Sequence, residues 1–448
     1  MNQIFRLRRV GLDCVAWDWI ASRGIGLTIC LLALPCSATD YSTTNREALG
    51  HFWKAAEERN RPVTVLSFGD SMANSYQSAT YYLMLQFEER LGTAGYALNN
   101  YRNKLMAQLT NGAAFLPDSA IWFTQHYYVP PTGGVWWENY GSAGGIVCNE
   151  VGIFYVRQPQ GGLITLSVST NGGPWGTKLV LDGYSPTPVG AFTNVNLSPN
   201  LHRIRVDGIT GTNYIIGPQL LMAHTNGLQV AFMDQPGIPL YTVTNVPLSI
   251  RAPVFAALKP DLLIWHMKEP IEPLPSGLAE CESWWTSACP DCDVLYIGTP
   301  WTLVDTNGGT VTLDQNRLVR EAAVNYGRAY VDLMQPGISY DWLRTNGLIS
   351  ADGVHLTPAG GQWGGNIMWN DLGLFALGLP RRLSLELTGG LAHVTFPTAS
   401  GATYTLQSST NLQTWLPELT TPGTGADCST NLTPTNPQRF YRLSLTPN

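Results

Sequence analysis

The sequence has few charged residues for its length, and it has no stripe of basic ones. Charged residues make up 13% of the 448 residues, compared with about a quarter in an average globular protein. This low charge, with 45 glycines and 30 prolines, is typical of a folded protein rich in strands and loops rather than of a disordered chain. The formal net charge of −6 and the missing basic stripe argue against a nucleic-acid partner.

Long hydrophobic runs are also scarce, and the one that stands out lies near the N-terminus. Several arginines precede the apolar run 25–34, and small residues follow at 35–38. The run is too short to cross a membrane comfortably, and the pattern is that of a signal peptide. We therefore expect residues 1–38 to be removed, the mature chain to have no transmembrane span, and the protein to be secreted or to lie in the periplasm or cell envelope. The alternatives are an uncleaved anchor and a lipoprotein attached at Cys36.

Few cysteines would remain after removal of the signal peptide, and their number is odd. In an oxidising compartment we expect a local disulfide within the segment 281–292, which carries a Cys-Pro-Asp-Cys motif at its end. A thioredoxin-like redox role for this motif is the alternative, but its surroundings do not support it. No further zinc ligands stand near it, so we expect neither a metal nor another cofactor. The remaining cysteines are Cys148, Cys281, Cys289, Cys292 and Cys428.

Strand and helix patterns alternate in two separate parts of the chain, 39–126 and 226–380. Such alternation predicts an α/β fold with a parallel sheet and helices on both faces. The predicted strands are 63–68, 228–233, 261–266, 294–298 and 329–333, and the predicted helices are 45–60, 81–91, 248–258, 313–326 and 359–376.

Two other parts have short alternating runs separated by turn residues. Between 127 and 225 the candidate strands are 152–157, 162–168, 177–181 and 201–206, which predicts an inserted antiparallel β-sandwich. The C-terminal part, 381–448, has candidate strands at 383–387, 392–396, 404–408 and 440–445 and predicts a second, smaller β domain. The length of the chain agrees with several domains.

Three residues far apart in the sequence supply the groups of an acyl-transfer site. Ser71 follows the buried strand 63–68, at a strand-to-helix connection where a side chain can stand above a parallel sheet. Asp352 and His355 lie three residues apart in a turn, where the carboxylate can orient the imidazole as a base for the serine. The alternatives are that Ser71 only caps a helix and that the other two form a surface turn.

The motifs around these residues resemble those of the SGNH (GDSL-type) hydrolases. Gly69-Asp70-Ser71 is similar to the first block of that family, and the segment 352–357, Asp-Gly-Val-His-Leu-Thr, to its last. The Gly-x-Ser-x-Gly elbow of α/β-hydrolases is absent around Ser71. The resemblance covers about residues 62–378 and extends to a subgroup with an inserted β domain. It implies a three-layer α/β/α sandwich with Ser71 as nucleophile, His355 as general base and Asp352 as its orienting carboxylate.

The same resemblance implies an oxyanion hole, and here the sequence departs from the family pattern. Relatives have an asparagine in their third block, and this chain has Lys268 at that position. Their second block supplies a glycine N–H, for which Gly237 and Leu240 are the candidates. Loss of an asparagine donor costs about 10²–10³ in turnover, unless the ammonium group of Lys268 takes its place. A surface ion pair of Lys268 is the alternative.

Aromatic residues are abundant, and we expect many of them in loops, where flat rings around a cleft suit sugars. Ordinary core packing is the alternative for each ring. The segments 404–415 and 438–442 resemble a small β-sandwich module of secreted bacterial proteins, which implies an accessory domain or a spacer. The tryptophans expected in loops are Trp122, Trp136, Trp137, Trp175, Trp284, Trp285, Trp301 and Trp342.

Taken together, these features predict a secreted serine esterase that hydrolyses O-acyl groups, most simply O-acetyl groups, on a polysaccharide or cell-wall glycan. The expected partner is an acylated glycan or a small ester. Because the oxyanion blocks are altered, the alternative is a degenerate SGNH protein that binds glycan without hydrolysis. A lipase is a weaker alternative, since no long apolar lid segment is evident.

Overall fold

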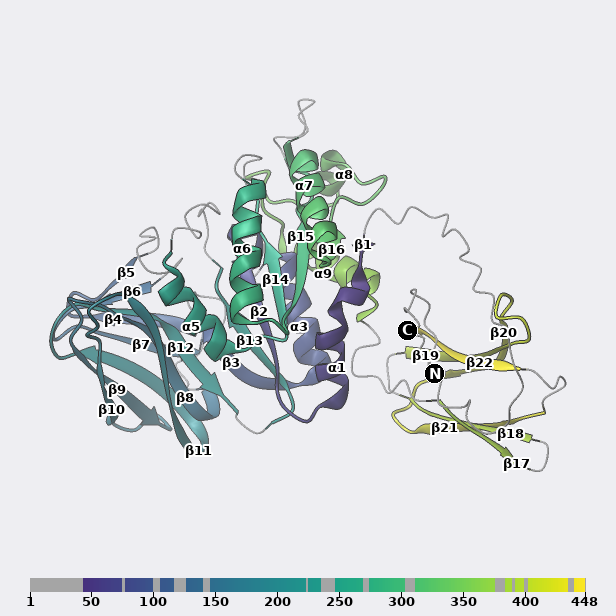
Figure 1. The fold of residues 1–448 in the computed structure, drawn as a ribbon, viewed down its shortest axis with the longest axis horizontal. Helices are drawn as coiled ribbons and strands as arrows, with labels where there is room; N and C mark the ends of the chain where they lie inside the picture. The colour runs from purple at the N-terminus through teal and green to yellow at the C-terminus, as the bar shows by residue number, and fades with distance from the viewer. Residues whose placement is uncertain are drawn as a thin grey trace, which may run out of the picture. The chain divides into compact units, whose positions relative to one another are not determined.

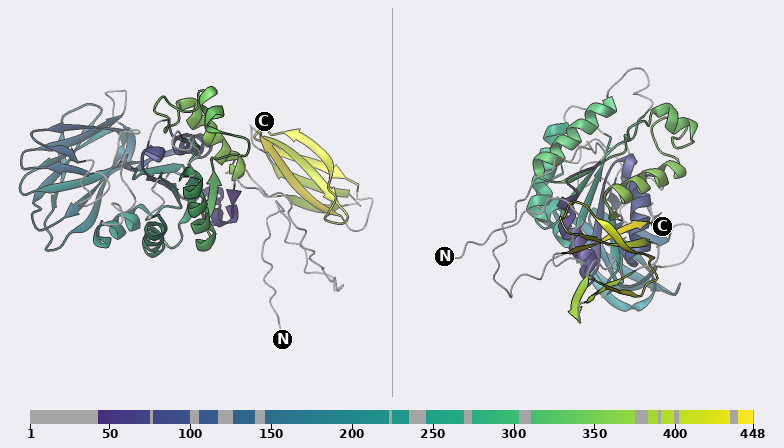
Figure 2. Two further views of the ribbon diagram at one scale, coloured as in Figure 1. Left: turned by 90° about the horizontal axis from the view of Figure 1, so that it is seen from above. Right: turned by 90° about the vertical axis from the view of Figure 1, so that its right-hand side faces the viewer.

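The computed structural model divides the chain into two compact units, residues 40–374 and residues 375–448 together with 1–39, which are described separately (Figures 1 and 2). The described residues are 43–74, 77–99, 105–116, 126–139, 146–222, 225–234, 246–268, 274–302, 311–374, 383–388, 391–398, 402–433 and 439–447. The predicted signal peptide lies outside them and stays a prediction.

The larger unit contains a mixed sheet whose central part is parallel. Six parallel strands follow the order β16-β15-β14-β2-β13-β3, and the short β1 (Thr43–Thr44) pairs antiparallel with β16. The strands predicted for this part are all present, whereas β3 was not predicted. Their bounds are β2 Val63–Gly69, β3 Thr93–Asn99, β13 Leu228–Phe232, β14 Leu262–His266, β15 Asp293–Gly298 and β16 Ala329–Asp332.

Helices cover both faces of this sheet, as Figures 1 and 2 show. On one face Phe87 of α3 packs on Phe52 of α1 (ring centroids 5.2 Å apart) and on Trp369 of α9 (5.8 Å). On the other face α5, α6 and α7 bury their apolar residues against the strands. The helices are η1 Arg46–Leu49 (3₁₀), α1 Gly50–Glu58, α2 Ser71–Asn74, α3 Ala79–Leu91, α5 Leu248–Leu258, α6 Leu274–Ala288, α7 Val311–Tyr326, α8 Tyr340–Thr345 and α9 Pro358–Asp371.

Between β3 and β13 the chain forms a series of antiparallel strands with their own core. The long β11 bridges this region, because its first half pairs with β8 and its second half with β7 and β9. These strands are β4 Leu105–Thr110, β5 Ala114–Leu116, β6 His126–Val129, β7 Gly134–Asn139, β8 Ile146–Arg157, β9 Leu163–Thr170, β10 Gly176–Asp182, β11 Val189–Gly208 and β12 Asn213–Leu221.

The antiparallel region is joined to the parallel sheet by hydrogen bonds, a feature that the sequence did not indicate. β12 pairs with β3 through Leu220↔Tyr96 and Leu221↔Gly95. Gly95 has φ +102°, and a Cβ atom there would lie 2.3 Å from the carbonyl oxygen of Leu220. Only glycine therefore permits this close pairing of β3 with β12.

The smaller unit has two three-stranded antiparallel sheets, β17-β18-β21 and β20-β19-β22, which share one apolar core. Val394 and Phe396 of one sheet contribute to this core together with Tyr404, Leu406 and Leu443 of the other. The strands are β17 Ser384–Thr388, β18 Leu391–Pro397, β19 Ala402–Ser409, β20 Leu416–Pro422, β21 Asp427–Leu432 and β22 Phe440–Pro447.

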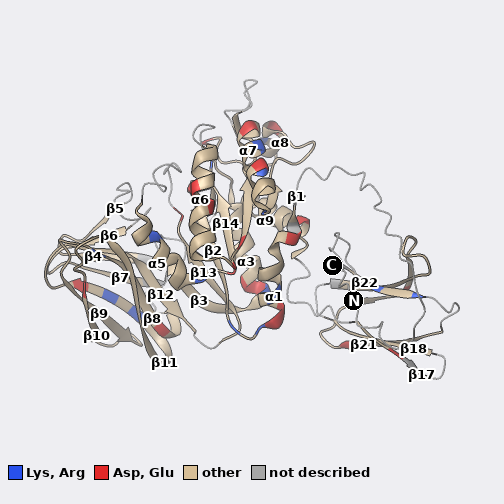
Figure 3. Ribbon diagram, viewed as in Figure 1, with Lys and Arg blue, Asp and Glu red and all other residues tan. Residues whose placement is uncertain are grey.

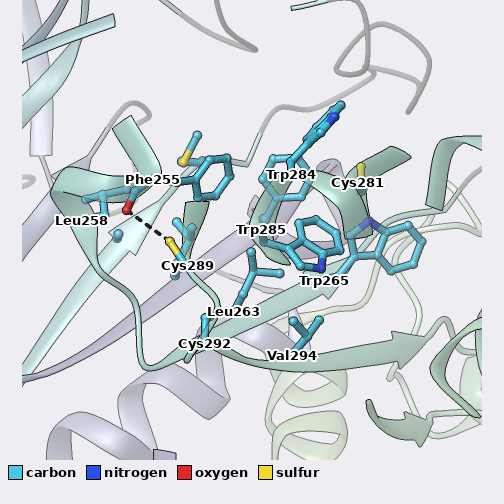
Figure 4. Packing of buried hydrophobic residues seen from close by; sticks show 14 of the residues in the cluster. Phe255, Leu258, Leu263, Trp265, Cys281, Trp284, Trp285, Cys289, Cys292 and Val294 are labelled. Carbon is cyan, nitrogen blue, oxygen red and sulfur yellow. Dashed lines mark hydrogen bonds between the residues drawn. The ribbon is translucent and has the colours of Figure 1, made fainter. Parts of the chain in front are cut away.

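The cysteines of α6 and its C-terminal turn do not form the expected disulfide. Cys289 donates a hydrogen bond from Sγ to the carbonyl oxygen of Phe255 at 3.3 Å, and Cys292 to that of Asp293 at 3.2 Å. Both thiols lie in the apolar packing between α5, α6 and the sheet, where Figure 4 shows them beside Leu258 and Leu263. Burial raises the pKa of Cys289 to about 11, so this thiol is kept protonated and unreactive.

Most of the tryptophans expected in loops lie on regular elements, which corrects that expectation. Trp284 and Trp285 are buried on α6 (Figure 4) and Trp137 is buried on β7. Trp136 also lies on β7 and Trp342 on α8, whereas Trp175 and Trp301 lie in loops. Trp122 falls outside the described residues. Core packing therefore accounts for the buried rings.

Candidate active site

Ser71 stands at the carboxyl end of the central strand β2, as the first residue of the short helix α2. All seven residues of β2 are buried, so the strand fixes the position at which the chain emerges from the sheet. Gly69 is required there, because a Cβ atom would lie 2.0 Å from the carbonyl oxygen of His266 on the neighbouring β14. The amide of Asp70 donates to the same carbonyl at 3.4 Å. These contacts hold the turn that presents Ser71.

The structure brings Ser71, His355 and Asp352 together in one hydrogen-bonded row. His355 Nε2 lies 2.9 Å from Ser71 Oγ, and His355 Nδ1 lies 2.7 Å from Asp352 Oδ2. The turn that carries both residues is closed by Asp352 Oδ1, which accepts from the amides of Val354 (2.8 Å) and His355 (3.0 Å). Gly353 has φ +72°, a conformation that favours glycine. This is the geometry of a nucleophile, its base and an orienting carboxylate.

The carboxylate of Asp352 is kept ionised by its hydrogen bonds. Partial desolvation acts to raise its pKa, but hydrogen bonds from Ser350, His355 and the two amides outweigh it and hold the pKa well below the ordinary value. An ionised Asp352 favours the imidazole tautomer with a proton on Nδ1, which leaves Nε2 free to accept from Ser71. The side chains of Asp352 and His355 remain 51% and 35% exposed, so this side of the site is open to solvent.

On the other side of the serine, the buried carboxyl of Asp70 connects two loops. Its Oδ1 accepts from the amide of Met72 at 2.8 Å, and its Oδ2 accepts from the amide of Lys268 at 2.9 Å. Burial raises the pKa of Asp70 to about 6, although these amides oppose the shift. Asp70 therefore fastens the nucleophile turn to the segment that follows β14. Sequence reasoning used Asp70 only as part of a motif and missed this role.

Lys268 lies after β14, and both of its nitrogen atoms are engaged. The amide donates to Asp70, and the ammonium donates to Thr302 Oγ1 at 2.6 Å, on the loop after β15. Thr302 is buried and lies 3.3 Å from Thr312 Oγ1. The other two oxyanion candidates, Gly237 and Leu240, lie outside the described residues.

Two further polar side chains, Ser67 and Asp234, are buried near the carboxyl ends of β2 and β13, and neither was singled out as a site residue from the sequence. Ser67 on β2 donates to the carboxyl of Asp234, with Oγ at 2.8 and 2.9 Å from its two oxygens. Burial raises the pKa of Asp234 to about 8, so this group is largely protonated near neutral pH. The signal that could have located Asp234 is its place directly after the buried strand β13, at the carboxyl end of the sheet.

His266, the last residue of β14, is buried, and the hydrogen bond of its side chain connects the sheet to α3. Its Nδ1 lies 2.9 Å from Thr80 Oγ1 on α3, and its Nε2 has no hydrogen-bond partner in the described part of the chain. Burial lowers the pKa of His266 to about 3, which keeps the imidazole neutral.

A small hollow beside Ser71 is lined by Ser71, Met72, Gln77, Ser78, His355 and Leu356.

The described residues contain no group of three or more histidines, cysteines or acidic side chains that could hold a metal ion. Among the same residues, no helix is long and apolar enough to cross a membrane.

No family model and no curated protein matches this sequence. Among solved structures, a peptidoglycan O-acetylesterase is similar with a TM-score of 0.57 and 16% identity, over 74% of this chain and 98% of its own. A GDSL-like lipase from Parabacteroides merdae matches at a TM-score of 0.27 and 16% identity, over 33% of this chain and 74% of its own. The first likeness shows a shared fold, and the second is too weak to carry an argument.

Proposed function

We propose that the protein is a serine ester hydrolase that removes O-acyl groups, most simply O-acetyl groups, from a glycan. The observation that carries the proposal is the row Ser71–His355–Asp352, with contacts of 2.9 and 2.7 Å. Such a row makes a serine hydroxyl nucleophilic, because the base can accept its proton as the bond to the carbonyl carbon forms.

The steps follow from the positions of these three groups. Ser71 Oγ attacks the ester carbonyl while its proton moves to His355 Nε2, and Asp352 stabilises the resulting imidazolium. His355 then returns the proton to the departing alcohol oxygen, which leaves an acyl-serine. Water attacks this acyl group while His355 accepts its proton, and as the bond from the acyl carbon to Ser71 Oγ breaks, His355 returns the proton to Oγ and the carboxylic acid is released.

The oxyanion of each tetrahedral intermediate needs donors, and one of them is in place. The amide of Ser71 opens α2 and has no hydrogen bond within the described residues, so it can donate to the oxyanion. The amide of Lys268 is already held by Asp70, and its ammonium donates to Thr302. In this proposal Lys268 therefore supports the loop rather than the oxyanion.

The glycan part of the proposal is supported by the fold shared with a peptidoglycan O-acetylesterase, whose own chain is covered over 98% of its length. The open side of the site at His355 and Asp352 suits a substrate too large to be enclosed. We further propose that residues 1–38 direct the chain out of the cytoplasm, because such glycans lie outside it.

The second candidate is glycan binding without hydrolysis. It is favoured by one observation, the engagement of Lys268 Nζ by Thr302, since this chain has no asparagine at that position to donate to an oxyanion.

Hydrolysis of p-nitrophenyl acetate separates the two candidates. The mature protein should release acetate, and Ser71→Ala should lose about 10⁶-fold in turnover. Ser283→Ala, an exposed serine on α6, is the matched control and should keep the parental rate. A folded parent protein without activity, or an active Ser71→Ala variant, would refute the esterase.

A further inference from the structure

Helix α7 buries polar side chains in its first half and apolar ones in its second. Its outer face carries exposed ion pairs, and Figure 3 shows acidic and basic segments on this helix. Its inner face buries Val319 and Ala323 towards the C-terminal end, as the packing of a helix on a sheet requires. Towards the N-terminal end it instead buries Thr312, Gln315 and Asn316. Buried polar side chains need hydrogen-bond partners, so these residues should connect α7 to its neighbours.

The two adjacent amides of α7 bind different segments. Asn316 Oδ1 accepts from the amide of Thr299 at 3.0 Å, and its Nδ2 donates to the carbonyl oxygen of Thr299 at 2.8 Å and to Asp332 Oδ1 at 2.9 Å. Gln315 donates from Nε2 to the carbonyl oxygen of Met267, directly after β14, at 2.8 Å. Asn316 therefore joins the ends of β15 and β16, whereas Gln315 joins α7 to the segment after β14.

The carbonyl that Gln315 binds belongs to the same peptide unit whose N–H is bound by Asp70. This unit joins Met267 to Lys268 and is planar, with its oxygen and its N–H on opposite sides. The oxygen accepts from Gln315 at 2.8 Å, and the N–H donates to Asp70 Oδ2 at 2.9 Å. The peptide plane therefore cannot turn without losing these bonds. We call the Met267–Lys268 unit the clamped peptide.

From the clamped peptide the contacts lead to the nucleophile. Asp70 Oδ1 accepts from the amide of Met72 at 2.8 Å, and this amide belongs to the peptide unit that follows Ser71. Asp70 and Met72 are both buried, so water does not compete for the bond. A donor to a peptide oxygen polarises the unit and strengthens the hydrogen bond that its N–H donates. A displacement of the clamped peptide is therefore passed through Asp70 to the turn that carries Ser71.

We propose that Gln315 is a positioning residue for the nucleophile. It fixes the clamped peptide, through which Asp70 holds Ser71 at 2.9 Å from His355 Nε2. Within the described residues the buried Oε1 of Gln315 has no hydrogen-bond partner, so the bond from Nε2 to Met267 is what a buried amide contributes at this position. The inference rests on the proposed function, because that function makes Ser71 the nucleophile.

The first measurement tests the positioning directly and needs no turnover. Gln315→Met keeps the length of the side chain and removes the donor, and Gln315→Leu is a second variant without it. Hydrogen exchange of the mature protein, followed by mass spectrometry, should become about tenfold faster in the fragments that contain the amides of Lys268 and Met72. Val319→Ala is the matched control, because Val319 is buried one turn further along the same helix. It should leave exchange in both fragments at the parental rate.

The second measurement is a double-mutant cycle in the hydrolysis of p-nitrophenyl acetate. Gln315→Met should lower kcat about tenfold through a displaced nucleophile turn. Val319→Ala should lower the melting temperature and keep the parental kcat. If Gln315 acts through Asp70, the double variant Gln315→Met/Asp70→Asn should be at most about threefold slower than Asp70→Asn alone, because both changes release the same peptide.

Three outcomes would overturn the inference. They are parental exchange at Lys268 and Met72 in the Gln315 variants, an equal loss of kcat in Val319→Ala, and a double variant in which the two losses multiply. A folded parent protein that does not hydrolyse p-nitrophenyl acetate would refute the esterase. Faster exchange at Met72 in Gln315→Met would then still establish that Gln315 positions the turn of Ser71.

Discussion

Aspartates are buried at both ends of the parallel sheet, but their hydrogen-bond and ion-pair partners differ. At the amino end, Asp261 precedes β14 and is paired with Arg61, at 2.5 Å between Oδ1 and Nη2, while its Oδ2 accepts from the amide of Thr64 at 2.9 Å. At the carboxyl end, Asp70 is held by backbone amides, and Asp234 by the hydroxyl of Ser67. Burial raises the pKa of both Asp70 and Asp234.

This difference separates stability from chemistry. The negative charge of a buried carboxylate is already neutralised when an arginine pairs with it, so this group is not available to bind a substrate or to transfer a proton. Perturbed carboxyls and a nucleophile at the carboxyl ends of parallel strands mark the place where such sheets bind ligands. Asp352, the carboxylate of the proposed triad, is half exposed, and its hydrogen bonds from Ser350, His355 and two amides hold its pKa below the ordinary value.

Among the changes to aspartates and to Lys268, the largest effect should come from Asp352→Asn. The amide cannot hold the Nδ1–H tautomer of His355 or stabilise the imidazolium, so turnover should fall about 10³–10⁴-fold. The melting temperature should change little, because the side chain is half exposed. Rates with p-nitrophenyl acetate and thermal unfolding check this, with Asp341→Asn on α8 as a control. A loss of less than tenfold would remove Asp352 from the mechanism.

Asp70→Asn should have the second-largest effect on turnover. Its comparison with a change at the opposite end of the sheet tests the difference between the two ends directly. An amide can accept only through its oxygen, so one of the two amides, of Met72 or Lys268, loses its acceptor and the loops shift. A displacement of about 1 Å costs about 10²-fold in turnover, and the unsatisfied group costs about 1–3 kcal/mol of stability.

The matched control for this change is Asp261→Asn at the opposite end. It removes a buried carboxylate with comparable backbone contacts and an ion pair. Its unfolding free energy should therefore fall, while kcat and KM remain parental. An equal loss of turnover in both variants would show that general destabilisation, rather than the position of Asp70, controls the rate.

The third prediction concerns pH. The folded pKa of Asp234, about 8, lies above the unfolded value near 4, so the folded state binds the extra proton between these pH values. The stability that this proton contributes is thus fully present at low pH and is lost as the pH rises through 8. Between pH 6 and 8, above the pKa of Asp70, the parental melting temperature should fall by a few degrees. Asp234→Asn should flatten this fall, and an unchanged slope would contradict the assignment.

The smallest effect should come from Lys268→Ala. Since the ammonium donates to Thr302, its removal should reduce turnover by less than about tenfold, compared with about 10²–10³-fold for an oxyanion donor. Lys54→Ala, an exposed lysine on α1, is the control. A loss near 10³-fold would return Lys268 to the oxyanion hole and break the distinction between supporting and reacting groups.

Local patterns in the sequence were sufficient for most of the α/β elements, and the family resemblance supplied the expectation that three distant site residues meet. Ser71 follows a strongly apolar strand, and Asp352 and His355 share one short turn, so the local geometry of each segment could be read from its own residues. α6 was missed because Pro275 and Gly277, near its start, are poor helix formers, whereas tertiary packing of Trp284 and Trp285 stabilises it.

What the sequence could not predict depends on contacts between distant segments. The partner of the Lys268 ammonium, Thr302, lies on the loop after another strand, and the carboxyl of Asp70 reaches an amide 198 residues away. The expected disulfide failed for a similar reason. The cysteines are near each other in the chain, but the packing of α5 against α6 gives Cys289 the carbonyl of Phe255 as its partner, and Cys292 bonds to the carbonyl of its neighbour Asp293.

The pairing of β3 with β12 has a consequence for how the molecule can be shortened. Without the antiparallel region, β3 would become an edge strand with a row of unpaired amides and carbonyls, which is a template for aggregation. A deletion of residues 105–221 should therefore yield insoluble protein, even though Ser71, His355 and Asp352 lie outside that segment. The region between β3 and β13 thus protects the edge of the parallel sheet from pairing with other chains.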